Sequence, residues 1–131
     1  MVKKLLCSVC NDKYILGMEI LLYSLKKYNN IDFDIKIYNR CDLSEDNKNK
    51  LKKIYNNLIF ESINEDFFKN NKPHYMSLLA FKECEYDRVI YIDCDILCVG
   101  NIEKLFTIKK DFSICYDTNV PYFYPKKNIV V

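Results

Sequence analysis

Two hydrophobic periods follow one another along the first part of the chain. The apolar run at 4–9 predicts a buried strand, which ends in a polar turn at Asn11-Asp12. From Tyr14 to Tyr28 the apolar positions recur every three or four residues, which predicts a helix. The segment 31–38 alternates apolar and charged residues, as in a half-buried strand, and we expect this strand near an edge of the sheet.

The next part of the chain repeats this order of elements. Ser44 is a suitable N-cap for a helix whose apolar positions lie three or four residues apart. The segment 58–62 then offers a short strand. Residues 64–73 are polar and end in a proline, so they predict a loop, and a helix is expected from position 74 or 75 to about 85.

The segment 88–92 is the most informative strand of the prediction. It is β-branched and aromatic without polar alternation, which indicates a central parallel strand covered on both faces. A short helix at 102–106, capped by Asn101, and a strand at 112–116 follow. Strands that alternate with helices form right-handed βαβ units, so we expect an α/β fold with a mostly parallel sheet and helices on both faces.

Composition restricts the function classes. The chain has 131 residues, half of them hydrophobic, with 2 Gly and 3 Pro, so one folded domain over 1–131 is expected. Lys and Arg number 20 against 18 Asp and Glu, a net charge of +2, which gives no basic footprint for nucleic acid. No segment is apolar enough for a signal peptide or a membrane span, so a cytoplasmic location is expected.

Seven cysteines are present, and we expect them to be reduced, small hydrophobic residues. Cys7 and Cys10 form a C-x-x-C pattern, but on a strand residues three apart point to opposite faces and cannot share a metal. Cys94 and Cys98 have no second pair at zinc spacing, so a structural zinc site is not expected.

Asp93 and Asp95 directly follow the strand at 88–92. In an extended segment their carboxylates would project to the same side, with Cys94 facing away. Mg²⁺ and Mn²⁺ take one or two protein carboxylates together with phosphate oxygens, so the pair suits a nucleotide diphosphate. The alternative is that the acids only keep a turn solvated or cap a helix. Because ligands bind outside the carboxyl ends of parallel strands, the turns at 10–12 and 93–95 should converge on one crevice.

Two segments carry a family resemblance. Residues 86–97, YDRVIYIDCDIL, followed by NIEKLF at 101–106, closely resemble the metal-binding segment of the glycogenin-like family 8 glycosyltransferases. CNDKY at 10–14, with Gly17 and the helix segment SLKKY at 24–28, resembles the nucleotide-binding opening of that family. The resemblance implies a GT-A, Rossmann-like nucleotide-sugar-binding half-domain, a UDP-sugar donor, Mn²⁺ or Mg²⁺, and transfer with retained anomeric configuration.

The resemblance also implies roles for individual residues. Asp93 would bind ribose and metal, Asp95 would bind metal, and Tyr14 would offer a stacking surface for the base. The positions that match nucleotide-contacting segments of the family are Ser8, Cys10, Asn11, Tyr14, Asp93 and Cys94. The catalytic residues are not identified. Local alternatives remain, because Tyr14 can simply pack the first helix and Asn11 can shape the turn or cap that helix.

Some residues depart from the family pattern. The basic residue that the family carries before the D-x-D strand, near the diphosphate, is absent at 76–79, and Lys72 and Lys82 are the nearest substitutes. The lone histidine, His74, precedes the D-x-D and is interpreted as a helix-start residue. The resemblance ends near Asn128, so a C-terminal truncation is expected, with the acceptor-side acids and the third metal ligand missing.

Three functions therefore stay open at the level of sequence. The first is a metal-dependent transferase acting on an unknown glycan, lipid or protein acceptor. The second is a truncated, non-catalytic module that binds nucleotide or only folds. Because the missing C-terminal part would leave an unpaired sheet edge and exposed apolar surface, self-association is a further prediction. The third is a haloacid-dehalogenase-like phosphatase with Asp93 as nucleophile, although Leu97 occupies the position where that class carries Thr or Val.

Overall fold

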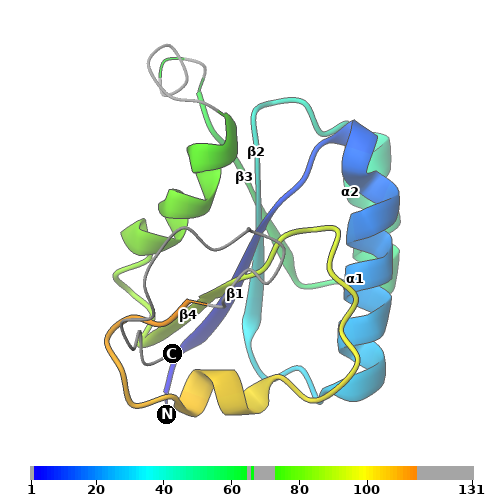
Figure 1. Cartoon of the computed structure of the whole chain (residues 1–131). Coiled ribbons are helices and arrows are strands. Elements are labelled where there is room, and N and C mark those ends of the chain that lie inside the picture. The colour runs from blue at the N-terminus through cyan, green and yellow to red at the C-terminus, as the bar shows by residue number, and fades with distance from the viewer. Residues whose placement is uncertain (1, 65, 67–72, 115–131) are drawn as a thin grey trace, which may run out of the picture.

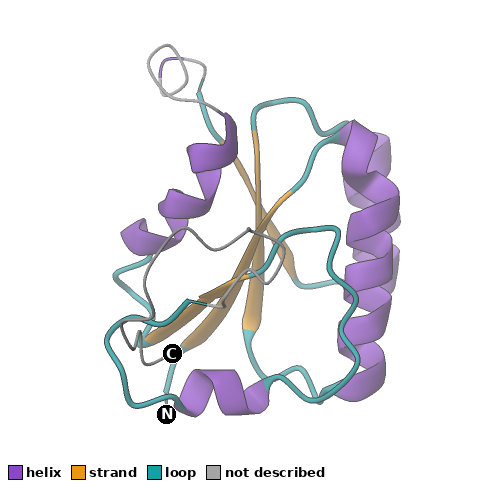
Figure 2. Cartoon of the chain, viewed as in Figure 1, coloured by secondary structure: helices purple, strands orange, loops and turns teal. Residues whose placement is uncertain are grey.

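The computed structural model describes residues 2–64, 66 and 73–114, and in these segments the chain forms a parallel four-stranded sheet (Figures 1 and 2). The strand order is β3-β2-β1-β4. The strands are β1 (Lys4–Val9), β2 (Asp34–Asn39), β3 (Leu58–Ser62) and β4 (Arg88–Tyr91). All three pairings are parallel, so every strand ends at the same edge of the sheet.

Helices cover both faces of the sheet (Figure 2). On one face, α1 (Ile15–Tyr28) and α2 (Glu45–Ile54) enclose the larger core, which Phe106 of the 3₁₀ helix η4 (Glu103–Thr107) closes at one end. On the other face, the 3₁₀ helix η3 (Pro73–Lys82) encloses a smaller core with β1 and β2. A short 3₁₀ helix, η1 (Asp12–Tyr14), leads into α1. The predicted α/β fold is confirmed.

Local sequence explains where the two α-helices begin and end. In α1 the buried residues recur at helical spacing, and the helix stops at Asn29, whose backbone N–H and side-chain amide both donate to the Leu25 carbonyl. In α2 the Ser44 hydroxyl accepts from the Asn47 amide at 3.4 Å, with acids in the first turn and lysines in the last. Both helices follow the prediction closely.

The structure corrects two strand predictions. The strand predicted to be half-buried and near an edge is β2, which lies next to the edge strand β3 but has a strand on each side and is almost wholly buried. The strand predicted at the centre became β4, which forms an edge of the described sheet and is only half-buried. The alternation of charge misled in β2 because Lys36 is buried with a counter-ion instead of facing water.

The described residues differ from the prediction in two further places. The segment 112–114 is irregular, so the strand predicted at 112–116 does not form in its described part, and positions 115 and 116 lie outside the described residues. The helix predicted at 74–85 is the 3₁₀ helix η3, which begins at the expected place but ends at Lys82. Most of the loop predicted at 64–73 also lies outside the described residues.

Lys36 is the centre of a buried polar network under η3. Its ammonium lies 2.8 and 2.7 Å from the two carboxylate oxygens of Glu83 and 3.3 Å from Glu61 Oε2. The Tyr38 hydroxyl donates a short hydrogen bond to Glu83, and the Cys7 thiol lies 3.8 Å from that hydroxyl. Burial disfavours both charged forms, but the hydrogen bonds and attraction between the two groups outweigh it. The pKa of Glu83 is therefore lowered and that of Lys36 is raised. The network fastens the end of η3 to β2.

Several large apolar side chains are exposed among the described residues. Leu16, Ile20 and Tyr23 are exposed on the outer side of α1. Self-association through such a surface stays a prediction. Among the described residues, no helix has both the length and the apolar character that a membrane crossing needs.

We predict that Lys36→Met lowers the free energy of unfolding at pH 7 by about 3 kcal/mol, because it leaves the Glu83 carboxylate buried without its counter-ion. Lys36→Met combined with Glu83→Gln should recover most of this loss. Urea titration followed by circular dichroism measures the changes. The matched control is Lys48→Met, which breaks a helix-surface pair with the exposed Glu45 and should cost less than about 0.5 kcal/mol.

The destabilisation should depend on pH with a defined sign. The folded-state pKa of Glu83 is lowered from 4.5, so its ionised form stabilises the wild type above that value and the benefit disappears as the pH falls. In Lys36→Met the buried carboxyl lacks its counter-ion and takes up a proton more readily, so the gap between wild type and variant should narrow as the pH falls from 7 to 3. A gap of equal size at both pH values would contradict the assigned role of the pair.

Candidate functional site

Two polar turns leave neighbouring strands at the carboxyl edge of the sheet. The Ile92 amide donates to the Cys7 carbonyl at 3.0 Å and continues the β1–β4 ladder beyond the end of β4. The Cys10 amide donates to the Tyr38 carbonyl at 3.0 Å and continues the β1–β2 ladder in the same way. The turns at 10–12 and 93–95 therefore emerge side by side, as the sequence predicts.

The first turn is held by its own side chains. Asn11 Oδ1 accepts from the amides of Lys13 at 3.0 Å and Tyr14 at 3.3 Å, and so caps η1. The Tyr14 ring beyond it is 55% exposed at the same edge, so it is available for stacking. The helix-cap alternative for Asn11 is thus realised, and its predicted nucleotide contact stays a prediction.

Asp12 fastens this turn to the beginning of α2. Its Oδ1 accepts from the Ser44 amide at 2.8 Å, the Ser44 hydroxyl at 3.1 Å and the Asn47 side chain at 2.8 Å. The hydrogen bond from the Ser44 amide and that from Asn47 hold the pKa of Asp12 below its usual value. The carboxylate therefore stays ionised as a structural acceptor.

Ser8 and Cys10 lie inside the protein, although the family resemblance implies that they contact the nucleotide. Ser8 is fully buried, and among the described residues its hydroxyl has no hydrogen-bond partner. Cys10 is 1% exposed and belongs to the core under α1. Neither side chain offers a surface to a ligand in this structure, so their contacts remain predictions, whereas Asn11 and Tyr14 reach the surface.

The D-x-D segment forms a tight turn. The Ile96 amide donates to the Asp93 carbonyl at 3.3 Å, so the chain is not extended through Asp95 as we expected. Asp93 and Asp95 are exposed, whereas Cys94 packs against the core on the α1 side. The outcome still matches the expectation that Cys94 faces away from two solvent-facing carboxylates.

Asp93 has a partner that the sequence analysis did not identify. The Tyr91 hydroxyl donates to Asp93 Oδ1 at 2.8 Å. Burial and this hydrogen bond raise the pKa of Tyr91, so the phenol remains a donor. The signal was present in the sequence, because residues two apart at the end of a strand share a face. The hydrogen bond orients one carboxylate oxygen and leaves the other for a ligand.

A hydrogen bond between the thiols of Cys10 and Cys94 joins the two turns on the α1 side of the sheet. Their hydrogen bond raises the pKa of Cys10, as does burial, and the same hydrogen bond lowers the pKa of Cys94. Cys7 lies in the other core, on the η3 side of the sheet. The prediction that Cys7 and Cys10 point to opposite faces is confirmed.

The D-x-D pair fits an open metal site. Within 2–64, 66 and 73–114, no group of three or more His, Cys, Asp or Glu could hold a metal ion. Asp93 and Asp95 thus supply two hard carboxylates without a protein cage around them. Mg²⁺ and Mn²⁺ keep several waters and complete their shell with substrate phosphates, so this donor set fits a cation that binds together with a diphosphate.

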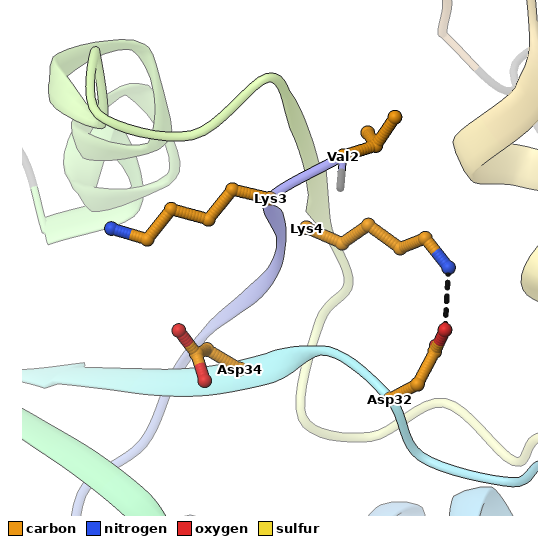
Figure 3. A pocket seen from close by; sticks show the side chains of 5 residues that line it. All are labelled: Val2, Lys3, Lys4, Asp32 and Asp34. Carbon is orange, nitrogen blue, oxygen red and sulfur yellow. Dashed lines mark hydrogen bonds and ion pairs between the residues drawn. The ribbon is translucent and has the colours of Figure 1, made fainter.

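A hollow of about 310 Å³ lies at the opposite, amino edge of the sheet and is separate from this site (Figure 3). The charged side chains that line it have partners, either within the hollow or just outside it. The Lys4 ammonium lies 2.7 Å from Asp32 Oδ2, and Asp34 accepts from the Tyr86 hydroxyl at 2.9 Å. We assign this hollow a structural role.

The remaining residues named from the sequence lie as follows. Lys82 is exposed at the end of η3. His74 lies in the first turn of η3, as expected for a helix-start residue. Lys72 lies outside the described residues. The contact between Asp12 and Ser44 had no sequence signal, because 32 positions separate the two residues.

The fold and the site together define a class. A parallel α/β sheet that presents a capped turn and two exposed acids at one carboxyl edge is typical of ligand-binding α/β domains. Residues 6–128 match the model of Glycosyl transferase family 8, and the chain belongs to this family. The match favours the transferase over the D-x-D phosphatase.

A viral relative is similar over most of the chain. It is the "Uncharacterized protein R707" of Acanthamoeba polyphaga mimivirus, which is 28% identical over 119 residues. The similar region covers 86% of this chain and 42% of the relative. The chain thus spans less than half the length of that protein.

We predict that Asn11→Ala lowers the free energy of unfolding by about 1 kcal/mol, because two amides of η1 lose their acceptor. Asn11→Asp keeps an acceptor oxygen and should be nearly as stable as the wild type. Thermal and urea unfolding of the three proteins measure the difference. Equal stability of Asn11→Ala and Asn11→Asp would contradict the cap.

Proposed function

We propose that this protein is a metal-dependent glycosyltransferase that moves a hexosyl group from a UDP-sugar to a hydroxyl of a glycan, lipid or protein, with retention of anomeric configuration. One observation carries the proposal. The exposed carboxylates of Asp93 and Asp95 stand in a turn that contacts Cys10 and Gly17, the residues on either side of the turn that carries Asn11 and Tyr14, at the carboxyl edge of the sheet. The family match supports the class of reaction.

The described residues divide the work of donor binding. Tyr14 offers an exposed ring on which the uracil stacks. The Asp93 oxygen that Tyr91 leaves unbonded binds the ribose and the cation, and Asp95 binds the cation. Lys82 is the described basic residue nearest in sequence to the position where the family carries one, but the chain just after it contacts Lys3 and Asp34 at the amino edge of the sheet, so we do not assign it to the diphosphate.

The chemistry transfers one glycosyl unit. The bond between the anomeric carbon and the β-phosphate oxygen breaks with its electron pair leaving on UDP, the acceptor oxygen bonds to the anomeric carbon, and the acceptor proton is released. When bound, the divalent cation neutralises the charge that develops on the leaving diphosphate. Asp93 and Asp95 hold their positions throughout, because their turn is anchored to the sheet and to α1.

A nucleotide-binding protein without turnover is the alternative. It is favoured by the finding that the described residues supply two carboxylates but no third ligand. The two functions share donor binding and differ in product. Incubation of the chain with UDP-glucose or UDP-galactose, Mn²⁺ and simple sugar acceptors, followed by detection of released UDP, separates them. Release of UDP that depends on Mn²⁺ supports the transferase.

We predict that UDP binds with a divalent cation and that Asp95→Asn weakens this binding at least ~10-fold without unfolding the protein. The carboxylate is exposed, so its loss costs the fold little, but it removes a charged ligand of the cation. Asp93→Asn should cause a larger loss, because the ribose contact is also weakened. Calorimetry of UDP with Mn²⁺, with Mg²⁺ and with chelator measures the affinities.

The matched control is Asp32→Asn, which removes an exposed carboxylate at the opposite edge of the sheet. It should leave UDP affinity unchanged. Circular dichroism confirms folding of each variant. Equal affinity of the wild type for UDP with Mn²⁺ and with chelator would show that the D-x-D acids do not form a metal site.

A further inference from the structure

Gly17 lies in α1 directly against the D-x-D turn. A Cβ at this position would be 2.9 Å from the Cys94 carbonyl oxygen and 3.5 Å from the Asp95 Cα. Both are main-chain atoms, so neither can rotate out of the way as a flexible side chain would. Any residue other than glycine would therefore have to push the turn and the helix apart.

Backbone conformation does not explain this glycine. No glycine in the described chain has a positive φ, and Gly17 lies in the first turn of α1. Glycine at such a position destabilises a helix relative to alanine, because it loses more conformational freedom on folding. The close approach of the turn is what requires a residue without a side chain.

The rest of the loop after the D-x-D runs along the same helix (Figure 1, in yellow). The Ser24 hydroxyl accepts from the Cys98 amide at 3.0 Å while donating to the Leu21 carbonyl at 2.9 Å. At the end of α1, Asn29 Oδ1 accepts from the Ile102 amide at 2.7 Å. Gly17, Ser24 and Asn29 thus form a seat along α1, and Gly17 is the part of it that contacts the acids' own backbone.

We propose that Gly17 is a positioning residue that sets where Asp93 and Asp95 stand relative to the turn at 11–14. This inference rests on the proposed metal-dependent donor site. The two motifs come from turns far apart in sequence, and α1 links them physically: it begins at the first turn and supports the second at Gly17. A methyl group at Gly17 moves both carboxylates away from the turn at 11–14. Displacements on the ångström scale weaken preorganised sites strongly.

The chain contains a matched control, because its other glycine, Gly100, lies in the loop after the D-x-D and has no atom within 4 Å of where a Cβ would stand. We expect Gly17→Ala to weaken Mn²⁺-dependent UDP binding at least ~10-fold and Gly100→Ala to change it less than ~2-fold. Calorimetry with Mn²⁺ and with chelator measures both. Amide chemical shifts of the metal-free protein should change at residues 94–98 in Gly17→Ala and stay unchanged there in Gly100→Ala.

A double-mutant cycle separates positioning from general stability. If Gly17 acts through the acids, Asp95→Asn should cost much less in the Gly17→Ala background than in the wild type. If alanine merely perturbs folding, the losses of binding free energy from the two substitutions should add, and urea titration should show reduced stability. Additive losses, or wild-type metal-dependent affinity in Gly17→Ala, would overturn the inference while leaving the proposed site intact. Absence of metal-dependent binding in the wild type would overturn the proposed function, and the inference with it.

Ser24→Ala provides a second route if Gly17→Ala does not fold. It removes the acceptor of the Cys98 amide without adding an atom. We expect faster hydrogen exchange at that amide and a loss of Mn²⁺-dependent UDP affinity of several-fold. Faster exchange together with unchanged affinity would show that the seat along α1 does not position the acids.

Discussion

The parallel pairing of β4 beside β1 is the constraint on which the rest of the structure depends. β1 has hydrogen-bonded neighbours on both sides, β2 and β4, and is buried from Leu5 to Ser8. Because parallel strands end at the same edge, this pairing brings together two turns that lie more than eighty positions apart. The loops carry the chemistry, and the rigid sheet determines how far apart they stand.

Polar groups are placed according to what each region can satisfy. On the η3 face, the protein buries Lys36 and Glu83 as a pair that also serves Tyr38, so the cost of removing two charges from water is offset by hydrogen bonds. At the carboxyl edge, the side chain of Asn11 accepts hydrogen bonds from backbone amides, and that of Asp12 accepts from residues at the start of α2. The result is a rigid rim from which Tyr14, Asp93 and Asp95 remain exposed for a ligand.

The site therefore has two kinds of support. The side chain of Asp93 is oriented by Tyr91 on the η3 side of the sheet, and the backbone of its turn rests on α1 on the other side. Carboxylates on a surface loop gain a defined position only when both their rotamers and their backbone are restrained. This arrangement suits the proposed cation site, in which Asp93 and Asp95 would be the protein ligands and misplacement of either would remove one of the two.

Much of the chain follows from local sequence. Periodicity and capping residues give β1, α1, α2, β3 and β4 at their observed positions, because these signals depend on neighbours a few residues away. The resemblance in two short motifs indicated the family, since those residues are contiguous. The same information placed both acids at a strand end, where they are found exposed.

Tertiary structure decided what depends on distant contacts. The strand order, which put β2 inside and β4 outside among the described strands, is set by how the crossovers pack, and no local period encodes it. Lys36 is buried because Glu83 reaches it from another element, and Ser8 is buried because α1 covers its face. Gly17 matched a family pattern in the sequence, but its reason became visible only where a folded helix meets the carbonyl of Cys94.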